Sequence, residues 1–433
     1  MRVAYYLDNR FVENVDFGTP WEGNPGTGAS EYLQVAIPYF LKHYCGESVD
    51  PIILAHNIDL LPDDMETHQV DSIAHAAKRA KGLDVDFFVF RPRLNEEESI
   101  LDVVDELQLP SIGIGHLIPF PQHIRKMSRS DFFRAFVCVG REEYDFLLDT
   151  PIYNKIVCIN NGVHVESCLQ RDEIELDSKL VVYMGCLVFQ KGFHLLAMAW
   201  PEVLKRIPDA KLSVIGSLKM YRANAQLGPL SIADEEYERQ HIIPHLFLPD
   251  GQLHPSVIFH GNMGQEKYVL LRKAAVGVAN PSGQTETCCV SAVEMSACHT
   301  AVVSGAYYAL LDTVFHKQTG LLGRTVRDLA DNICQLLSSP HKAILYGENG
   351  FQRVMAEWDF SVVCPQWERL FYALKNGYKL KCQCPRRNIF RHRKFLRMLN
   401  HPAQALLGSI IRWPSLQECD RVIISLIRKI SNR

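Results

Sequence analysis

The sequence predicts an α/β protein with two Rossmann-like, doubly wound domains that face a central cleft, followed by a basic helical tail. Three observations lead to this fold class. The chain of 433 residues is long enough for two domains with full cores, and its 47% apolar and 22% charged content is typical of a globular protein. Short apolar runs that read as buried strands alternate with segments of helical periodicity. Several of these strands end at glycine-rich or polar loops, where open parallel sheets bind ligands.

In the first half of the chain, short apolar runs predict a parallel sheet. Between the first two runs, a glycine-rich loop leads into a helix at Glu31–Tyr44 whose apolar residues lie on one side. Backbone N–H groups of such a loop can hold phosphate, and Gly26 and Gly28 are the candidates. This glycine pair lacks the full dinucleotide-binding fingerprint, and flexible turns use the same residues. Six strands are expected: Arg2–Leu7, Ile52–Ala55, Phe87–Phe90, Ile112–Ile114, Ala135–Val139, and one within Lys155–His164 that closes on Asn161-Gly162-Val163.

The second half predicts another series of strands, loops and helices after an acidic linker. A helix at Phe193–Arg206 joins the first two strands, and Pro201 is expected to kink it. A polar insertion separates the second strand from the third. This order is typical of a second doubly wound parallel sheet. The expected strands are Leu180–Met184, Lys211–Ile215, Val257–His260, Ala274–Ala279 and Val302–Gly305.

One of these strands, Ala274–Ala279, leads into the stretch with the clearest functional pattern. The strand ends at the breaker Asn280-Pro281, and a polar loop with Glu286 precedes a helix from about Cys289 to Cys298. Glu294 borders the buried face of that helix. Such an arrangement suits a ligand with an anionic group at the helix start and hydroxyls on both sides of it, as in nucleotide sugars. Two glutamates at this spacing are also common as solvated surface charges.

The stretch resembles the donor-site signature of retaining GT-B glycosyltransferases, specifically the large family 4 group, whose two glutamates are separated by seven residues. The resemblance also covers Val181–Gly216 and extends more loosely over most of the first 375 residues. It implies an enzyme that moves a sugar from a nucleotide-diphosphate-sugar donor to a glycan, lipid or small-molecule acceptor, with retention at the anomeric carbon. It also implies that no metal or other cofactor is required.

The resemblance assigns expected roles to individual residues. Glu286 would hydrogen-bond the donor sugar, and Glu294 would accept hydrogen bonds from the ribose hydroxyls. Lys191 would neutralise the diphosphate, although a lone loop lysine is usually solvated. His116, at a strand end, would face the donor from the first domain, and a structural histidine is the plain alternative. The other expected donor-binding residues are Gly26, Gly28, Gly261, Cys288, Cys289 and Val290.

The sequence departs from the family pattern at three places. Cys186 stands where an arginine usually grips the diphosphate, and the loss of that charge-assisted contact would cost about 1.5–3 kcal/mol. Cys288-Cys289 replaces an aromatic residue and glycine, and His299 replaces glycine. These departures favour one alternative, a catalytically weak or silent GT-B scaffold that binds nucleotide or glycan. A nucleotide-sugar epimerase is a second alternative, whereas a dehydrogenase is disfavoured because no intact GxGxxG follows a strand.

The predicted organisation has four parts. Residues 1–170 form the acceptor domain and residues 171–345 the donor domain. Residues 346–378 form crossing helices that return to the first domain, with Trp367, Leu370 and Phe371 on their apolar side. Residues 379–433 form a basic amphipathic tail outside the family resemblance.

The tail differs from the rest of the chain in charge. It holds 13 Lys and Arg residues against Glu418 and Asp420, a local charge of +11. Because the whole chain has a net charge of −3, the preceding residues carry −14. Ile423, Ile427 and Ile430 give an apolar stripe on a predicted helix. This combination suits an anionic membrane surface, and a helix packed on the body or on a second subunit is the alternative. The basic cluster consists of Arg386, Arg387, Arg391, Arg393, Lys394 and Arg397.

Other features narrow the setting of the protein. No reader motif accompanies the basic residues, so nucleic acid is not an expected partner. The amino terminus has no long apolar segment, and no apolar run reaches about 18 residues, so neither a signal peptide nor a spanning helix is expected. The 13 cysteines are scattered without zinc spacing. We therefore expect a reduced, cytoplasmic setting, peripheral to the inner face of the membrane if the tail binds lipid.

Overall fold

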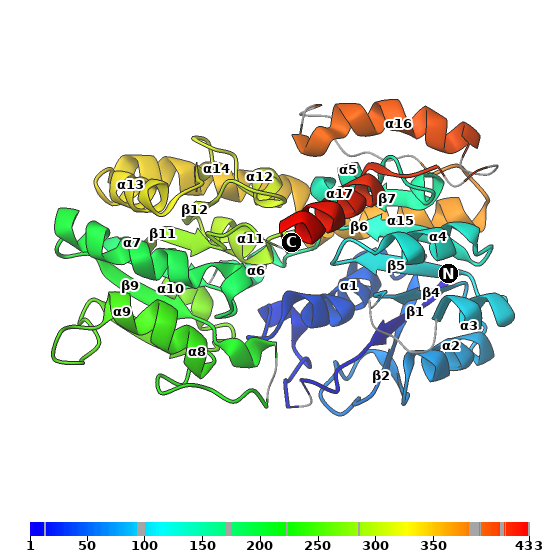
Figure 1. The fold of residues 1–433 in the computed structure, drawn as a ribbon. Helices are drawn as coiled ribbons and strands as arrows, with labels where there is room; N and C mark the ends of the chain where they lie inside the picture. The colour runs from blue at the N-terminus through cyan, green and yellow to red at the C-terminus, as the bar shows by residue number, and fades with distance from the viewer. Residues whose placement is uncertain are drawn as a thin grey trace.

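The computed structural model contains two Rossmann-like domains, each built on one parallel sheet, as the sequence predicts (Figure 1). It describes residues 1–12, 14–92, 100–169, 175–221, 224–284, 286–380, 389, 391–407, 411 and 413–431. The first domain has a seven-stranded sheet and the second a six-stranded sheet. Helices cover both faces of each sheet, so most of the strands are buried apolar runs.

The first sheet has the strand order β3-β2-β1-β4-β5-β6-β7. All six strands predicted in this half are present, with the sixth as β7, whereas β3 was not predicted. The residues of β3 are polar and partly exposed at the sheet edge, so no apolar run marks them. The strands are β1 Arg2–Leu7, β2 Asp50–Ala55, β3 Glu66–Gln69, β4 Phe87–Phe90, β5 Ser111–Gly115, β6 Phe133–Cys138 and β7 Ile156–Cys158. The helices are α1 Ala29–Cys45, α2 Ile73–Gly82, α3 Ile100–Glu106, α4 Pro121–Arg129, α5 Arg141–Leu147 and α6 Val165–Cys168.

The second sheet has the order β10-β9-β8-β11-β12-β13, and all five predicted strands are present. Helix α7 spans the predicted Phe193–Arg206 as one element, and Pro201 does not divide it. The strands are β8 Asp177–Met184, β9 Lys211–Ile215, β10 Val257–Gly261, β11 Ala274–Ala279, β12 Ala301–Gly305 and β13 Gly320–Gly323. The other helices are α8 Glu235–Tyr237, α9 Ile243–Leu246, α10 Lys267–Lys273, α11 Val290–Ala297, α12 Leu310–Thr313, α13 Val326–Leu337 and α14 Pro340–Glu357.

The chain returns to the first domain just after α14. That helix packs on α11 and β12 of the second domain, whereas α15 (Phe360–Lys375) packs on α1 of the first. The return point is fixed by backbone hydrogen bonds, since Val163 N–H donates to Trp358 O at 2.8 Å and Phe360 N–H donates to Val163 O at 3.2 Å. The predicted boundary between residues 170 and 171 lies outside the described residues.

The hydrophobic core continues through this connection. Side chains of α1, α15 and the inner face of the first sheet form one buried cluster with α11 and its neighbours in the second domain. Trp367 of α15 is 1% exposed and packs edge-on against Tyr5 of β1, with ring centroids 6.3 Å apart. The two domains are therefore joined by packed side chains as well as by the chain itself.

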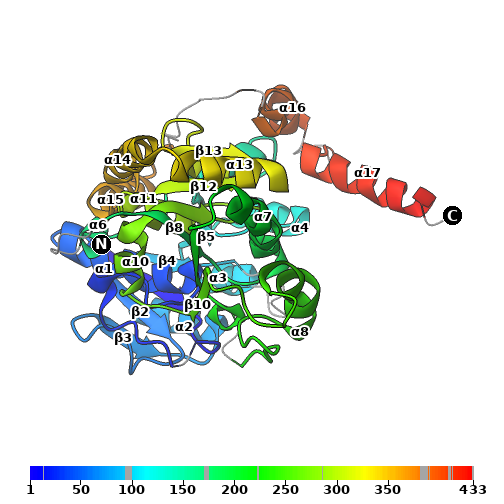
Figure 2. The ribbon, with the colours of Figure 1, turned by 90° about the vertical axis from the view of Figure 1, so that its left-hand side faces the viewer.

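The basic tail forms two further helices, α16 (Lys394–Leu407) and α17 (Leu416–Ser431). Helix α16 lies beside α5 on the outside of the first domain, and α17 extends away from the body in Figure 2. No helix within the part of the chain that the structure describes has the length and apolar character needed to cross a membrane.

The structure corrects the expected role of the basic cluster. Arg391 binds Asp312 at 2.6 Å and Glu142 at 3.1 Å, so it joins the two domains. Lys394 and Arg397 are 4% and 1% exposed and pair with acidic residues of the body. These three cations therefore face the protein instead of a membrane. Arg393 is exposed but pairs with Asp420, and Arg386 and Arg387 lie outside the described residues.

Candidate functional site

The loop after β11 places Glu286 at the carboxyl edge of the second sheet, beside Lys191. Asn280 ends the strand with φ +36°, and its side-chain amide donates to Glu286 Oε1 at 2.7 Å. Lys191 Nζ donates to the same oxygen at 2.5 Å. Glu286 is 7% exposed, so its carboxylate is held by two donors in a nearly dry position.

Lys191 reaches this position from the short turn Phe189–Lys191 that precedes α7. Gly192 follows with φ +71°, and a Cβ at that position would lie 2.4 Å from Ser282 N, so only glycine allows this turn to approach the loop after β11. Burial disfavours the ammonium, but the Glu286 carboxylate outweighs it and raises the pKa of Lys191 well above its ordinary value. Lys191 therefore stays a cation at any physiological pH.

Glu294 lies on α11, the helix that follows the Glu286 loop, and forms a separate ion pair. Its Oε1 atom is 2.9 Å from Lys267 Nζ and accepts a hydrogen bond from Tyr268 OH at 3.0 Å. The Lys267 ammonium also donates to the backbone oxygen of Asn24 in the first domain at 3.0 Å. Lys267 thus connects one predicted site glutamate to the glycine-rich loop across the domain interface.

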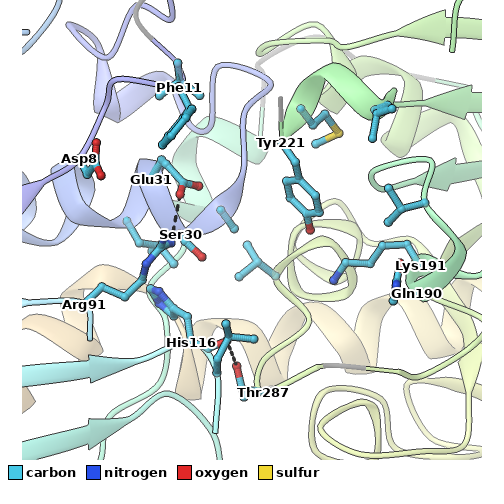
Figure 3. A pocket seen from close by; sticks show the side chains of 18 of the residues that line it. Asp8, Phe11, Ser30, Glu31, Arg91, His116, Gln190, Lys191, Tyr221 and Thr287 are labelled. Carbon is cyan, nitrogen blue, oxygen red and sulfur yellow. Dashed lines mark hydrogen bonds and ion pairs between the residues drawn. The ribbon is translucent and has the colours of Figure 1, made fainter. Parts of the chain in front are cut away.

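A cavity of about 1660 Å³ lies between the two domains beside Lys191 and Glu286. Figure 3 shows Glu31, Arg91 and His116 of the first domain on one side and Lys191 and Tyr221 of the second domain on the other. Lys191 and Glu286 also line a smaller adjoining chamber of about 100 Å³, which reaches Glu294 and the glycine-rich loop. The two predicted carboxylates and the predicted lysine therefore share one connected space.

The glycine-rich loop and the start of α11 enclose the smaller chamber. Gly26 has φ +94°, and a Cβ there would lie 2.7 Å from Met263 O, so the loop touches the second domain where only glycine fits. Gly28 precedes α1, and Asn24 Oδ1 accepts the Gly26 and Thr27 N–H groups at 3.0 Å each. On the opposite side, the chamber is lined by Cys288, Cys289, Val290 and Ser291 at the amino end of α11.

His116 lies directly after β5 on the wall of the larger cavity. Its Nε2 atom is 3.3 Å from Asn161 Oδ1, and its backbone oxygen accepts a hydrogen bond from Thr287 of the second domain at 3.2 Å. Burial, aided by the nearby Arg91 guanidinium, lowers the pKa of His116 to about 3. His116 is therefore a neutral imidazole at physiological pH.

Not every residue named from the sequence lies at the cavities. Gly261 ends β10, and the neighbouring Asn262 and Met263 line the smaller chamber in its place. Cys186 does line that chamber but is 2% exposed, so the position of the usual arginine holds a buried thiol. His299 lies just beyond the carboxyl end of α11, and its ring stacks on Phe351 with centroids 3.9 Å apart.

The sequence reading missed several side chains that hold the site together. Asn280 was interpreted only as a strand breaker and Asn161 only as the end of a strand, yet each contacts a predicted site residue. Lys267 was not predicted as a site residue. The spacing of Lys267 and Glu294 gave no signal, because they lie on separate helices that only the fold brings together. The described residues contain no group of three His, Cys, Asp or Glu side chains suited to a metal ion, and metal independence stays a prediction.

Comparisons with known proteins agree with this geometry. Residues 178–339 match the family model described as glycosyl transferases group 1. A mannosyltransferase of Mycobacterium tuberculosis, GDP-mannose-dependent and acting on phosphatidylinositol monomannoside by its name, is 25% identical over 181 residues, which is 41% of this chain and 43% of that protein. The corresponding protein of Mycolicibacterium smegmatis is 26% identical over 186 residues, 42% of this chain and 45% of its own length. The match thus spans less than half of these curated relatives.

Solved structures share the fold over a longer stretch. Sucrose-phosphate synthase from Thermosynechococcus elongatus has a TM-score of 0.64 at 17% identity and covers 87% of this chain and 100% of its own. A glycosyltransferase from Rickettsia africae gives 0.64 at 14% identity, with 86% and 98% covered. Anabaena Alr3699/HepE in complex with UDP and glucose gives 0.59 at 14% identity, with 86% and 100% covered. The GT-B fold and the resemblance to group 1 glycosyltransferases are confirmed.

Proposed function

We propose that this protein is a glycosyltransferase that moves a sugar from a nucleotide-diphosphate-sugar donor to an acceptor, with retention at the anomeric carbon and without a metal. The observation that carries the proposal is the pair of Lys191 and Glu286, which lie 2.5 Å apart on the wall of the interdomain cavity. A buried cation beside a buried carboxylate in a cleft is a common arrangement in active sites.

The proposed chemistry divides the two side chains between two parts of the donor. When the diphosphate enters, the Lys191 ammonium exchanges the Glu286 carboxylate for phosphate oxygens and stabilises the negative charge that builds on the leaving group. Glu286 is then released to accept hydrogen bonds from the sugar hydroxyls. The amino end of α11, which brings Cys288, Cys289 and Val290 to the chamber wall, adds a positive dipole beside the phosphates. In this account Glu294 accepts hydrogen bonds from the ribose.

Donor entry requires the domains to move apart. The smaller chamber has a volume of about 100 Å³, well below the roughly 300–1,000 Å³ of ordinary ligand pockets. Its roof is the loop of Gly26 and Gly28, held to the second domain by Lys267 and the Asn24 backbone oxygen at 3.0 Å. We expect this contact to open for binding and to close over the pyrophosphate, which keeps water from the reacting carbon.

The acceptor side is proposed from the relatives and the cavity together. The larger cavity extends along the first domain past Asp8, Phe11 and Arg91, which leaves room for an acceptor opposite Lys191. The mycobacterial relatives, by their names, transfer mannose from GDP-mannose to a phosphatidylinositol glycolipid. A lipid-linked or free glycan is therefore the acceptor class we propose, with a small molecule as the alternative, and the site of action is the cytoplasmic side of a membrane.

A donor screen tests the proposal directly. The protein is heated with UDP, GDP and their sugar conjugates, because a ligand at 100 times its Kd stabilises the folded state by about 2.7 kcal/mol. The best donor is then incubated with glycan and glycolipid acceptors, and the anomeric configuration of the product is read by NMR. The same anomeric configuration in donor and product supports retention. Inversion, or the absence of any stabilising nucleotide, contradicts the proposal.

Cys186 favours a second candidate, a GT-B scaffold that binds nucleotide or glycan without turnover. The buried thiol leaves Lys191 without the usual second cation on the diphosphate. A scaffold would show the same thermal stabilisation by nucleotide but would release no free nucleotide diphosphate from any donor. Measured release above the rate of the donor alone excludes this candidate.

A further inference from the structure

Helix α16 has the opposite orientation from most surface helices, because its polar side chains face the protein and its apolar side chains face solvent. Lys394, Arg397 and Gln404 are 4%, 1% and 7% exposed. On the other side of the same helix, Leu399 and Leu406 are 60% and 72% exposed. An amphipathic helix of a globular protein normally buries its apolar stripe.

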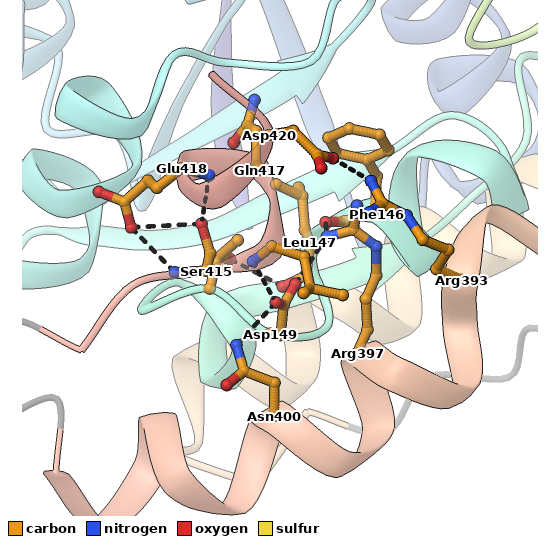
Figure 4. A network of polar contacts seen from close by, with 12 residues as sticks. Phe146, Leu147, Asp149, Arg393, Arg397, Asn400, Ser415, Gln417, Glu418 and Asp420 are labelled. Carbon is orange, nitrogen blue, oxygen red and sulfur yellow. Dashed lines mark hydrogen bonds and ion pairs between the residues drawn. The ribbon is translucent and has the colours of Figure 1, made fainter. Parts of the chain in front are cut away.

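Buried ion pairs fix this orientation. The Lys394 ammonium lies 2.5 Å from Asp145, and the Arg397 guanidinium lies 2.7 Å from Asp149. Asn400 adds a hydrogen bond to Asp149 at 2.9 Å, as Figure 4 shows. Turning the helix over would leave these charges buried without partners, at a cost that the exposed leucines could not offset.

The exposed side of α16 forms a continuous apolar strip. Leu399 and Leu406 are seven residues apart and therefore lie above one another on the helix, and Leu396 and Met398 flank them at 46% and 41% exposure. A contiguous exposed apolar surface on a globular protein marks an interaction site. We call this strip (Leu396, Met398, Leu399 and Leu406) the outer face of α16.

The surrounding charge identifies the partner. In the sequence, Lys381, Arg386 and Arg387 precede α16 and Arg412 follows it, and the only acidic residues between 379 and 433 are Glu418 and Asp420. An exposed apolar strip within a basic stretch of sequence suits a membrane with anionic lipids, where leucines enter the acyl boundary and Lys and Arg reach the head groups. A second copy of the chain would bring equally cationic segments together, which is unfavourable.

We propose that the outer face of α16 is a membrane-binding surface, with the helix lying in the plane of an anionic lipid layer and docked on the first domain by its polar side. The proposal keeps the membrane expected for the tail but changes the residues that meet it, since Lys394 and Arg397 anchor the helix to the body. It does not depend on the proposed sugar transfer, because lipid binding is measured without any donor.

The test is co-sedimentation of the full chain with vesicles of phosphatidylcholine alone and with about one-third phosphatidylglycerol. We expect binding to the anionic vesicles, and a loss of about tenfold or more in the double variant Leu399→Ser/Leu406→Ser, since two exposed leucines no longer enter the lipid. The matched control is Ile344→Ser/Leu345→Ser on α14, which replaces two side chains of 54% and 55% exposure outside the tail. This control should bind as the unchanged protein does.

Three results would overturn the proposal. One is the absence of binding to anionic vesicles, and another is equal binding by the leucine variant and the unchanged protein. The third is a dimer in light scattering that the leucine substitutions dissociate while vesicle binding is absent, which would identify a second copy as the partner. Because both substituted leucines are exposed, the thermal midpoint of the variant should match that of the control and show that loss of folding is not the cause.

Discussion

The cleft and the tail interface are both held by buried ion pairs, but they differ in what surrounds each pair. The side chains of Arg397 and Asp149 are 1% and 0% exposed. Asn400 and the Leu416 N–H donate further hydrogen bonds to the Asp149 carboxylate. Lys191, by contrast, is 19% exposed and borders a cavity of about 1660 Å³ together with Glu286. The tail pair has no room for another partner, whereas the cleft pair can exchange partners with a ligand.

Buried charge alone therefore does not locate a functional site. Both pairs are short and desolvated, and each would be costly to break by removing one member. The open space beside the charges is what separates a pair built for binding from a pair built for anchoring. Substitutions at the two pairs should therefore differ in whether they reduce stability or turnover.

The largest effect is expected in the tail. Arg397→Met leaves the Asp149 carboxylate buried without its cation, so the docking of α16 should weaken by about 3–5 kcal/mol. Hydrogen exchange of the α16 amides, followed by mass spectrometry, measures the loss. The double variant Arg397→Met/Asp149→Leu should recover much of it, because no charge is then buried alone. Arg239→Met, which breaks an exposed pair with Glu235, should change little, and equal effects at both arginines would contradict the account.

The next effect is expected in turnover instead of stability. Lys191→Met removes the cation proposed to stabilise the leaving diphosphate, so kcat should fall about 10²- to 10³-fold with the preferred donor. The control is Lys219→Met, an exposed lysine on the short turn Leu218–Met220 in the same domain, which should keep its activity. If Lys191→Met instead lowers stability and keeps its activity per folded molecule, the Lys191–Glu286 pair has a structural role, like the ion pairs that anchor the tail.

Features that depend on neighbouring residues in the chain were predictable from the sequence. The strands β1, β4 and β9 and helix α7 have the predicted bounds, because apolar periodicity is a local property. The spacing of Glu286 and Glu294 is likewise local and located the cleft. Edge strand β3 has no apolar run and was missed.

The partners of the charged residues were not predictable in the same way. Lys267 meets Glu294 and Asn24 only after three separate elements pack together. Likewise Arg397 and Asp149 are separated by 248 residues. A run of basic residues predicted an external anionic partner, but for Lys394 and Arg397 the observed partners are Asp145 and Asp149 of the same chain.

A smaller effect concerns pH and the first-domain wall of the cleft. With a native pKa of about 3 and an unfolded value of about 6.5, His116 binds a proton in the unfolded chain first as the pH falls. Its contribution to stability is therefore complete above pH 6.5 and is lost progressively toward pH 3, by about 2 kcal/mol between pH 7 and pH 5. Urea unfolding at both pH values should show that His116→Asn loses less stability over this range than the unchanged protein. An identical pH dependence would mean that the imidazole is not buried in solution.

We expect Glu286 to give up its contact with Lys191 and to accept hydrogen bonds from the sugar of a bound donor. The release of nucleotide diphosphate reports whether this exchange supports turnover. The rate is measured with the preferred donor and acceptor for the unchanged protein, for Glu286→Gln and for Glu202→Gln, a substitution on the exposed side of α7. The account predicts that Glu202→Gln keeps the full rate and that Glu286→Gln loses about 10²-fold or more. An unchanged rate in Glu286→Gln would contradict it.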